Sequence, residues 1–137
     1  MGKEDYKSLQ GDIRKIELPG IGTWDNEYSD KQYNVFFETE EFTCVCPKTG
    51  LPDFARLEID YSPDAKCIEL KSFKEYLLAY RDLGIFHEHV VNRLLEDLVR
   101  TCSPRYMKVR GIFGVRGGIK TTVEAEYDPR KETGTSR

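Results

Sequence analysis

An α+β domain is the fold class that this sequence predicts, on three observations. Apolar and polar residues alternate in 55–61 and again in 121–127, as they do in half-buried strands. Between these segments, apolar residues recur at helical spacing in 73–80 and 86–99. Turn-forming residues separate the segments, and a chain of 137 residues can bury one modest core. The expected order is ββααββ in a single domain.

The first two strands are expected in residues 33–46 and 55–61. Residues 33–46 are rich in aromatic and β-branched types, and Pro47 ends the run and introduces a loop. Residues 62–65 form another turn signal and lead into the short run 67–70. We therefore expect 55–61 and 67–70 to pair as a hairpin.

Two helices are expected next. In the first, Ser72 and Glu75 form a capping box, and Gly84 is the expected C-cap. The second begins after Phe86, has a broad apolar face and should end before Pro104. Its charged residues are expected largely on the opposite face: Arg93, Glu96, Asp97 and Arg100.

Residues 105–127 predict two further strands joined at Gly117-Gly118. The two ends of the chain are polar and lack a sustained period, which is typical of tails or docking arms. We therefore divide the chain into an N-terminal arm, residues 1–30, a domain, residues 31–127, and a C-terminal tail, residues 128–137.

The composition argues against several classes of protein. A net charge of -3 lacks the basic surface expected of a protein that holds long nucleic acid. No apolar run is long enough to span a bilayer, and the first ten residues lack the apolar core of a secretion signal. We expect no membrane partner, a cytoplasmic location and reduced thiols at Cys44, Cys46, Cys67 and Cys102.

Cys46 is the candidate nucleophile. Pro47 biases its backbone to an extended conformation and interrupts the strand there, so the thiol can project into a cleft. The alternative is a buried cysteine that acts as a small apolar residue. Asp53 follows across a turn with two prolines and a glycine, and it either folds a carboxyl back toward the thiol or only forms the turn.

Two more polar runs are conspicuous. His87 and Glu88 open the second helix, where an exposed charged first turn, favoured by the helix dipole, is the alternative to a functional role. Residues 69–74, ELKSFK, join a strand to the first helix. They are either a capped helix start with solvated lysines or part of a site.

Four segments, taken together, resemble the short, single-domain 7-cyano-7-deazaguanine reductases. Residues 42–54, FTCVCPKTGLPDF, resemble the catalytic segment of that family, and residues 69–74 resemble its signature. Phe86-His87-Glu88 matches its substrate-binding segment, and residues 114–119, GVRGGI, resemble its closing hairpin. The likeness runs in order from about Tyr33 to Tyr127. Glu75 departs from the extended signature, which usually has Leu or Tyr there.

The resemblance implies the tunnelling fold, an antiparallel sheet with two helices packed on one face. Such units assemble into rings with sites between subunits, and this chain is expected to form a homo-oligomer, a decamer of two stacked pentamers. The implied activity is the NADPH-dependent, four-electron reduction of the nitrile of 7-cyano-7-deazaguanine to 7-aminomethyl-7-deazaguanine, in the biosynthesis of queuosine for tRNA. No metal is expected.

The resemblance also implies roles for individual residues. Cys46 is the nucleophile that forms a thioimidate, Asp53 the proton donor, and His87 an acid–base or positioning group. The substrate-binding residues are Glu69, Leu70, Ser72, Phe86, His87 and Glu88. The residues expected to bind NADPH are Lys71, Ser72, Lys74, Arg116 and Gly117, because the 2′-phosphate calls for fixed positive charge.

Two alternatives from other classes of protein remain. One is a zinc-dependent hydrolase of the cyclohydrolase type, with Cys44, Cys46, His87 and His89 as ligands. Against it, Cys-x-Cys is a poor match to the usual chelate spacing, and a metal-bound Cys46 could not attack a substrate. The other is a non-catalytic subunit that binds a purine or pterin, which would tolerate the loss of Cys46.

Overall fold

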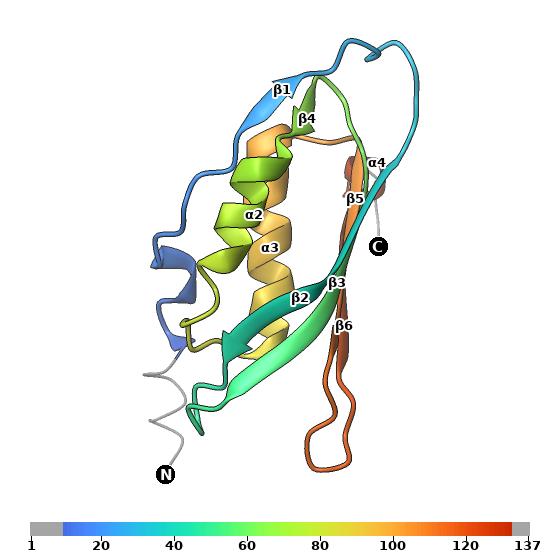
Figure 1. Cartoon of the computed structure of the whole chain (residues 1–137). Helices are drawn as coiled ribbons and strands as arrows, with labels where there is room; N and C mark the ends of the chain where they lie inside the picture. Colours follow the sequence, from blue (N-terminus) through green and yellow to red (C-terminus); the bar gives the residue numbers. More distant parts are fainter. Residues whose placement is uncertain (1–9, 133–137) are drawn as a thin grey trace.

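The computed structural model describes residues 10–132 (Figure 1). Along the chain, its elements are a 3-10 helix η1 (Ile13–Lys15), β1 (Thr23–Asp25), β2 (Val35–Val45), β3 (Pro52–Ser62), β4 (Lys66–Ile68), α2 (Leu70–Leu78), α3 (His87–Cys102), β5 (Tyr106–Phe113), β6 (Thr122–Tyr127) and α4 (Pro129–Glu132). The predicted ββααββ order is confirmed as β2, β3, α2, α3, β5 and β6.

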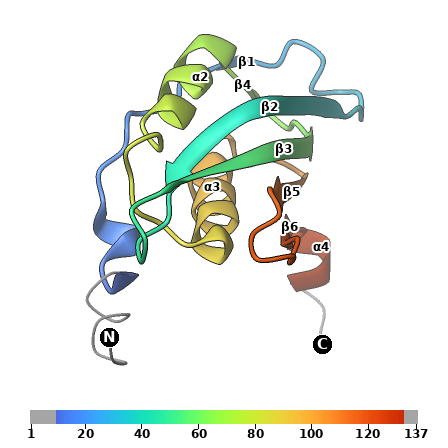
Figure 2. The same ribbon diagram turned by 60° about the horizontal axis from the view of Figure 1, so that its bottom comes forward.

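The main sheet has four strands in the order β2-β3-β5-β6, and every neighbouring pair is antiparallel. The helices α2 and α3 lie on one face of it (Figures 1 and 2), as predicted. The register of β2 on β3 shifts between Thr39 and Phe42, which marks a bulge or irregularity in β2. In this antiparallel pairing, the end of β2 lies next to the start of β3.

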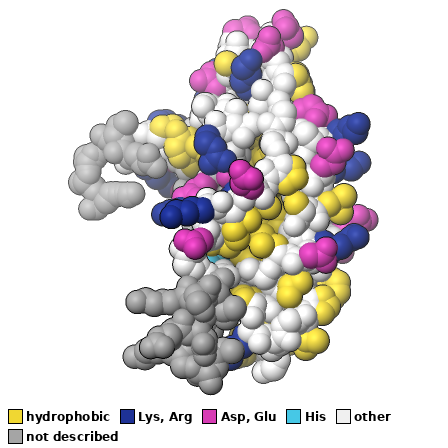
Figure 3. Space-filling model, turned by 90° about the vertical axis from the view of Figure 1, so that its left-hand side faces the viewer, with side chains coloured by type: hydrophobic (Ala, Val, Ile, Leu, Met, Phe, Trp, Pro, Cys, Tyr) yellow, Lys and Arg dark blue, Asp and Glu magenta, His cyan; other side chains and the backbone are white. Residues whose placement is uncertain are grey.

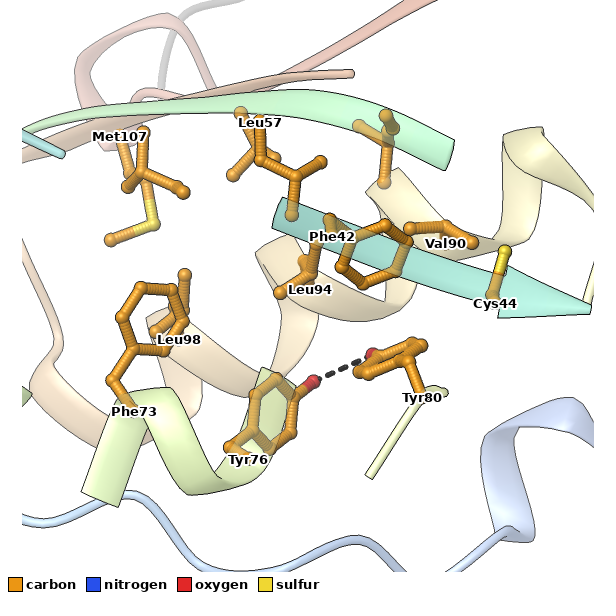
Figure 4. Packing of buried hydrophobic residues seen from close by; sticks show 14 of the residues in the cluster. Phe42, Cys44, Leu57, Phe73, Tyr76, Tyr80, Val90, Leu94, Leu98 and Met107 are labelled. Atoms are coloured by element: carbon orange, nitrogen blue, oxygen red, sulfur yellow. Dashed lines mark hydrogen bonds between the residues drawn. The ribbon is translucent and has the colours of Figure 1, made fainter. Parts of the chain in front are cut away.

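The hydrophobic core lies between this sheet and the two helices (Figure 4). Alternate residues of β3 and β5 are buried, and α2 contributes aromatic side chains at helical spacing. The side chains that are less than 2% exposed include Leu57, Ile59, Tyr61, Tyr76, Tyr80, Leu94, Leu98 and Met107. The two sequence periodicities therefore identified the core-facing residues correctly.

The expected hairpin of 55–61 with 67–70 is wrong. Both edges of β3 are occupied, by β2 on one side and β5 on the other, so β4 finds no free edge there. It pairs instead with β1, with Trp24 opposite Cys67. Residues 10–30, expected as an arm, thus lie against the domain, and the buried Gln10 and Asn26 belong to this segment.

The expected caps of the first helix are also wrong. The N-cap of α2 is Glu69, whose carboxylate accepts hydrogen bonds from the backbone N–H groups of Lys71 (2.9 Å) and Ser72 (2.8 Å). The helix ends at Leu78, with Ala79 as C-cap. Gly84 instead forms a bridge with Val45, because the chain after the helix is drawn alongside the end of β2.

Asp97 lies on the face of α3 that was predicted to be polar, yet it is only 4% exposed. Its carboxylate accepts hydrogen bonds from Arg93, Arg100 and the Tyr76 hydroxyl. We call these four residues the Asp97 cluster. The prediction failed here because α2 packs along this side of α3 and brings a tyrosine over the carboxylate.

The last two strands and their turn are as predicted. Gly117 and Gly118 have φ values of +58° and +79°, which a side chain would disfavour, and Arg116 and Ile119 close the turn with mutual backbone hydrogen bonds of 2.9 Å. Of the expected C-terminal tail, Asp128 is buried and α4 follows it, while residues 133–137 lie outside the described part. Within residues 10–132, no helix is long and apolar enough to cross a membrane.

Candidate active site

Cys46 lies in a closed turn directly after β2. Its backbone N–H donates to the carbonyl of Leu51 (2.8 Å), and its own carbonyl accepts from the N–H of Gly50 (2.8 Å). Gly50 has a φ of +74°, a conformation that glycine adopts without strain. The turn therefore holds the cysteine at the strand end, as the Cys-Pro sequence predicts.

Cys46 is half-buried, and the polar groups of Lys48 and Thr49 in the same turn affect the pKa of its thiol. Burial and the nearby charge of Asp53 raise the pKa of this thiol. Hydrogen bonds from the Thr49 hydroxyl and from the backbone N–H groups of Thr49 and Lys48 outweigh both effects, so the pKa of Cys46 lies below its ordinary value. A reachable thiol with a lowered pKa has the properties of a nucleophile.

Cys44, two residues earlier, has the opposite surroundings. Its side chain is fully buried in the core beside Phe42 and Tyr80 (Figure 4). Burial, together with the nearby Asp53 and Cys46, raises the pKa of the Cys44 thiol to about 12. Cys44 is thus a small core residue, and Cys46 is the thiol suited to chemistry.

Asp53 lies at the start of β3, with its side chain only 7% exposed. The ring Nε2 of His87 lies 3.2 Å from one carboxylate oxygen, and the guanidinium of Arg116 lies 2.8 Å from the other. Arg116 also donates to the carbonyl of Pro52. We call Asp53, His87 and Arg116 the Asp53 cluster. Its contacts come from α3 and the β5–β6 hairpin, so Asp53 does more than form a local turn.

The imidazole ring of His87 stacks on the ring of Phe113. The two rings are 3.9 Å apart between centroids and 8° from parallel. His87 opens α3, and Phe113 ends β5, so the stacking joins the helix start to the sheet. This contact fixes the plane of the imidazole and directs its Nε2 at Asp53.

The start of α3 is also tied to the N-terminal segment. The side-chain carbonyl of Gln10 accepts a hydrogen bond from the backbone N–H of Phe86 (3.2 Å) and lies 2.6 Å from the ring Nδ1 of His89. Phe86, the N-cap residue, is half-buried, and Glu88 in the first turn is exposed. The run 86–88 is therefore positioned from both sides, with Glu88 free to face a ligand.

The structure gathers one group of the predicted site residues at one end of the domain. Cys46 and Asp53 come from the β2–β3 connection, Phe86, His87 and Glu88 from the start of α3, and Arg116 and Gly117 from the β5–β6 hairpin. Figure 1 shows these three segments at the same end.

A second group lies at the other end, where the first turn of α2 stands beside β1 and β4 (Figure 1). It comprises Glu69, Leu70, Lys71, Ser72 and Lys74. The nine residues of α2, about 13 Å long at 1.5 Å per residue, and the loop after them separate this group from His87. Within one chain, the two groups do not meet.

In the second group, Glu69 and Ser72 already make local contacts. The Glu69 carboxylate caps α2, and hydrogen bonds from Ser72 and Lys71 lower the pKa of Glu69. The Ser72 hydroxyl donates to the Glu69 carbonyl and accepts from the N–H of Gly22 (2.8 Å). Lys71 and Lys74 are exposed on α2. Figure 3 shows both charged and apolar side chains on the left-hand side of the molecule as drawn in Figure 1.

Three residues of the site were missed by sequence reasoning: Gln10, Thr49 and Phe113. Thr49 could have been found, since it stands three residues after the cysteine in a turn-forming run. Phe113 follows the alternating pattern of β5, which predicts burial but no contact with His87. For Gln10, nothing local in the sequence indicates that it meets the start of α3.

The four candidate zinc ligands are not brought together. Cys44 is enclosed in the core, His87 lies against Asp53, and His89 lies against Gln10. Among residues 10–132, no group of three or more His, Cys, Asp or Glu side chains could hold a metal ion. The geometry favours thiol chemistry at this site.

A cysteine with a lowered pKa beside a buried acid–histidine pair defines the class: an enzyme that uses a thiol nucleophile with an acid–base group at hand. Residues 52–132 match the family described as "QueF-like protein". The chain belongs to this family, that of the NADPH-dependent 7-cyano-7-deazaguanine reductases.

Curated relatives show the same family. The NADPH-dependent 7-cyano-7-deazaguanine reductase of Syntrophus aciditrophicus (strain SB) is 59% identical over 114 residues, which cover 83% of this chain and 78% of the relative. The protein of the same name from Elusimicrobium minutum (strain Pei191) is 49% identical over 133 residues, 95% of this chain and 100% of the relative. Among solved structures, the archaeosine synthase QueF-Like in its apo form is similar, with a TM-score of 0.63 and 28% identity. That match covers 68% of this chain and 91% of the other.

Proposed function

We propose that this protein reduces the nitrile of 7-cyano-7-deazaguanine to 7-aminomethyl-7-deazaguanine with two molecules of NADPH. Membership of the reductase family supports the proposal. The single observation that carries the chemistry is that Cys46, in the turn between β2 and β3, lies at the same strand end as Asp53, which is in contact with His87.

In the first step, the Cys46 sulfur adds to the nitrile carbon. A nitrile carbon is a poor hydride acceptor, and the thioimidate that results from the addition is a better one. The nitrile nitrogen gains negative charge and takes a proton from the Asp53–His87 pair. The 3.2 Å contact between these two side chains makes them one acid unit, with Phe113 and Arg116 keeping its position.

NADPH supplies a hydride in each of the next two stages. After the first hydride reaches carbon, the tetrahedral adduct breaks its C–S bond, which releases the Cys46 thiolate and leaves an imine. The donors that stabilise the thiolate also make it a better leaving group here. The second hydride and a proton complete the amine, so one nitrile consumes two NADPH and two protons.

We infer that the complete substrate pocket forms between two copies of the chain. Glu88 and Phe86 lie at the Cys46 end, and Glu69 and Ser72 lie at the other end of the domain. A second copy that places its α2 start against Cys46 would bring the two groups together, in agreement with the predicted ring and with a decamer of two pentamers. Each carboxylate, Glu69 and Glu88, can then accept hydrogen bonds from the amino-pyrimidinone edge of the base.

Two lysines, Lys71 and Lys74, are suited to bind the phosphate groups of NADPH as the co-substrate. The exposed Lys71 and Lys74 have no ion pair with residues 10–132, so their charges are available to phosphate groups. Arg116, predicted as a third phosphate ligand, is engaged by Asp53 and would have to leave it to serve the cofactor. A reaction that draws on NADPH also suits the cytoplasmic location predicted from the sequence.

The proposed reaction is tested by incubating the protein with 7-cyano-7-deazaguanine and NADPH. We expect the absorbance of reduced nicotinamide to fall and two NADPH to be consumed per amine formed. Consumption without amine, or no consumption by a folded oligomer, would contradict the proposal. Full activity after metal removal separates it from the zinc-dependent alternative.

The shared pocket is tested by mixing subunits. Cys46→Ala should be inactive alone, Glu69→Gln should be weakly active at low substrate concentration, and co-expression of the two should raise the activity at that concentration, because some pockets then combine a native Cys46 with a native Glu69. If both residues acted within one chain, no mixed pocket would be intact and activity would not rise above that of Glu69→Gln alone. Co-expression of Cys46→Ala with Asp53→Asn is the matched control, since both changes lie in the same group and should not complement.

A further inference from the structure

Gln10, in the N-terminal segment, has a side chain buried against the start of α3. The residue is 9% exposed, although it stands 76 positions before Phe86. Its amide Nε2 donates a hydrogen bond to the carbonyl of Gly84 (3.2 Å), and its Oε1 accepts one from the backbone N–H of Phe86 (3.2 Å). The same oxygen lies 2.6 Å from Nδ1 of His89. One side chain from a distant part of the sequence thus contacts three residues around the first turn of α3.

These partners determine how the Gln10 amide is oriented. Gly84 presents a carbonyl, which can only accept, and Phe86 presents an N–H, which can only donate. The amide nitrogen therefore faces Gly84, and the oxygen faces Phe86. Because that oxygen is also an acceptor for His89, the Nδ1 of His89 carries a proton in this contact. A leucine at position 10 would have a similar length and could form none of these hydrogen bonds.

The segment 83–86 lies between the end of β2 and the start of α3 and bonds alternately to two partners. Its odd-numbered residues bond to Val45 of β2: the Leu83 carbonyl accepts from the N–H of Val45, and the Ile85 N–H donates to the carbonyl of Val45, each at 3.0 Å. Its even-numbered residues bond to Gln10 on the other side. The polar groups of strand-like backbone point alternately to opposite sides, so the Gln10 amide takes the place of a second neighbouring strand.

We propose that Gln10 is a positioning residue for substrate recognition, which holds Phe86 and Glu88 in the place where they contact the base. The inference rests on the proposed function, in which those two residues bind 7-cyano-7-deazaguanine. Phe86 is the N-cap of α3 and its apolar side chain makes no capping hydrogen bond, so the start of the helix depends on contacts from outside it. Gln10 provides such contacts, and Glu88, exposed in the first turn, is placed by that turn.

Titration calorimetry compares Gln10→Leu with Arg14→Leu, both in the Cys46→Ala background, which binds 7-cyano-7-deazaguanine without forming an adduct. Arg14 is the matched control, because it belongs to the same segment and also bonds to α3, but to Glu96, farther along the helix. Gln10→Leu leaves buried polar groups without their partners, so its dissociation constant should rise about tenfold. Arg14→Leu should bind as the parent does. Equal constants for Gln10→Leu and its parent would overturn the proposal.

A double-mutant cycle separates positioning from a general loosening of the fold. If Gln10 acts through Glu88, the effect of Gln10→Leu should shrink from about tenfold to less than about threefold once Glu88→Gln is present. An equal effect in both backgrounds would refute the proposal. Gln10→Glu decides the matter if Gln10→Leu does not fold. It keeps an acceptor for Phe86 and loses the donor to Gly84, so its dissociation constant should rise about threefold, and a native constant would also refute the proposal.

Hydrogen–deuterium exchange tests the contact of Gln10 with α3 in the absence of substrate. The Phe86 N–H is bonded to Gln10, so its exchange should be faster in Gln10→Leu and unchanged in Arg14→Leu. If Cys46→Ala does not bind 7-cyano-7-deazaguanine and the exchange at Phe86 still rises, the proposed function is refuted together with the substrate role of Gln10, whereas its contact with α3 stands. If the substrate binds equally well to Gln10→Leu and its parent, only the role of Gln10 is refuted.

Discussion

Two buried aspartates, Asp53 and Asp97, have similar partners and different surroundings. Each is paired with arginine, and each has a ring-bearing residue within hydrogen-bond distance, His87 for Asp53 and Tyr76 for Asp97. In the Asp97 cluster, Arg93 donates to Asp97 and to the carbonyls of Ile13 and Ile16, Tyr76 also contacts Tyr80, and Arg100 is exposed. It joins α3, α2 and the N-terminal segment.

The Asp53 cluster lies next to a reactive atom. The Cys46 thiol is close enough for the Asp53 charge to affect its pKa, and Arg116 is 45% exposed on a hairpin. The Asp97 cluster has only the tyrosines, whose pKa values burial raises. An ionic cluster therefore indicates a site when a nucleophile accompanies it, and it indicates architecture when its partners only join elements of the fold.

The largest expected effect is at Cys46. Cys46→Ala should abolish reduction and leave the assembly intact, because no other thiol stands in the turn. NADPH oxidation with substrate measures the activity, and size-exclusion chromatography measures the assembly. Cys44→Ala is the control: it removes a core side chain, so it should lower thermal stability and keep most of the activity of the folded protein. A Cys46→Ala variant with a tenth of native turnover would refute the assignment.

The second-largest effect is expected for Asp53→Asn. Asparagine keeps the size and most of the hydrogen bonding but cannot donate the proton, so thioimidate formation at saturating substrate should slow by about a hundredfold or more. Binding should survive, and stability should change by less than about 1 kcal/mol because Arg116 is partly exposed. A near-native rate of adduct formation would leave His87 as the proton source and Asp53 as its support.

Asp97→Asn should lower stability and leave the rate of adduct formation near native, the reverse of Asp53→Asn. Removing one charge of a buried pair leaves Arg93 incompletely paired, and such changes cost about 3 kcal/mol of stability. Thermal denaturation at matched protein concentration measures the loss, and the rate of adduct formation in the folded variant should stay near native. If Asp97→Asn instead slowed adduct formation at unchanged stability, the contrast between the two clusters would be wrong.

The smallest expected effect concerns Glu88. Glu88→Gln replaces one acceptor oxygen with an amide that cannot pair with the amino-pyrimidinone edge, so the dissociation constant for 7-cyano-7-deazaguanine should rise about 10-fold to 100-fold. Titration calorimetry with Cys46→Ala as background avoids covalent adducts. The exposed Glu96, farther along α3, provides the control, since Glu96→Gln should bind as the parent does. Equal constants for Glu88→Gln and its parent would exclude the role.

Local patterns in the sequence were sufficient for the elements that carry the site. The alternation in 55–61, the helical spacing after Phe86 and the paired glycines at 117 and 118 each correspond to an element that the structure contains. The Cys46-Pro47 turn was also predictable, because proline and glycine restrict their own backbone and that of their neighbours. Resemblance to the family added the roles, which local pattern does not carry.

Contacts between distant segments were decided by the tertiary structure. Arg116 meets Asp53 because the β5–β6 hairpin extends past the start of β3, and Asp97 is buried because α2 lies across it. Likewise, β4 pairs with β1 because both edges of β3 are taken. Periodicity records which face of an element is apolar, and it does not record which element packs against that face. The sequence by itself therefore determined the elements and the nucleophile's turn, whereas packing decided which charges became partners and left Glu69 at the opposite end of the domain from Cys46.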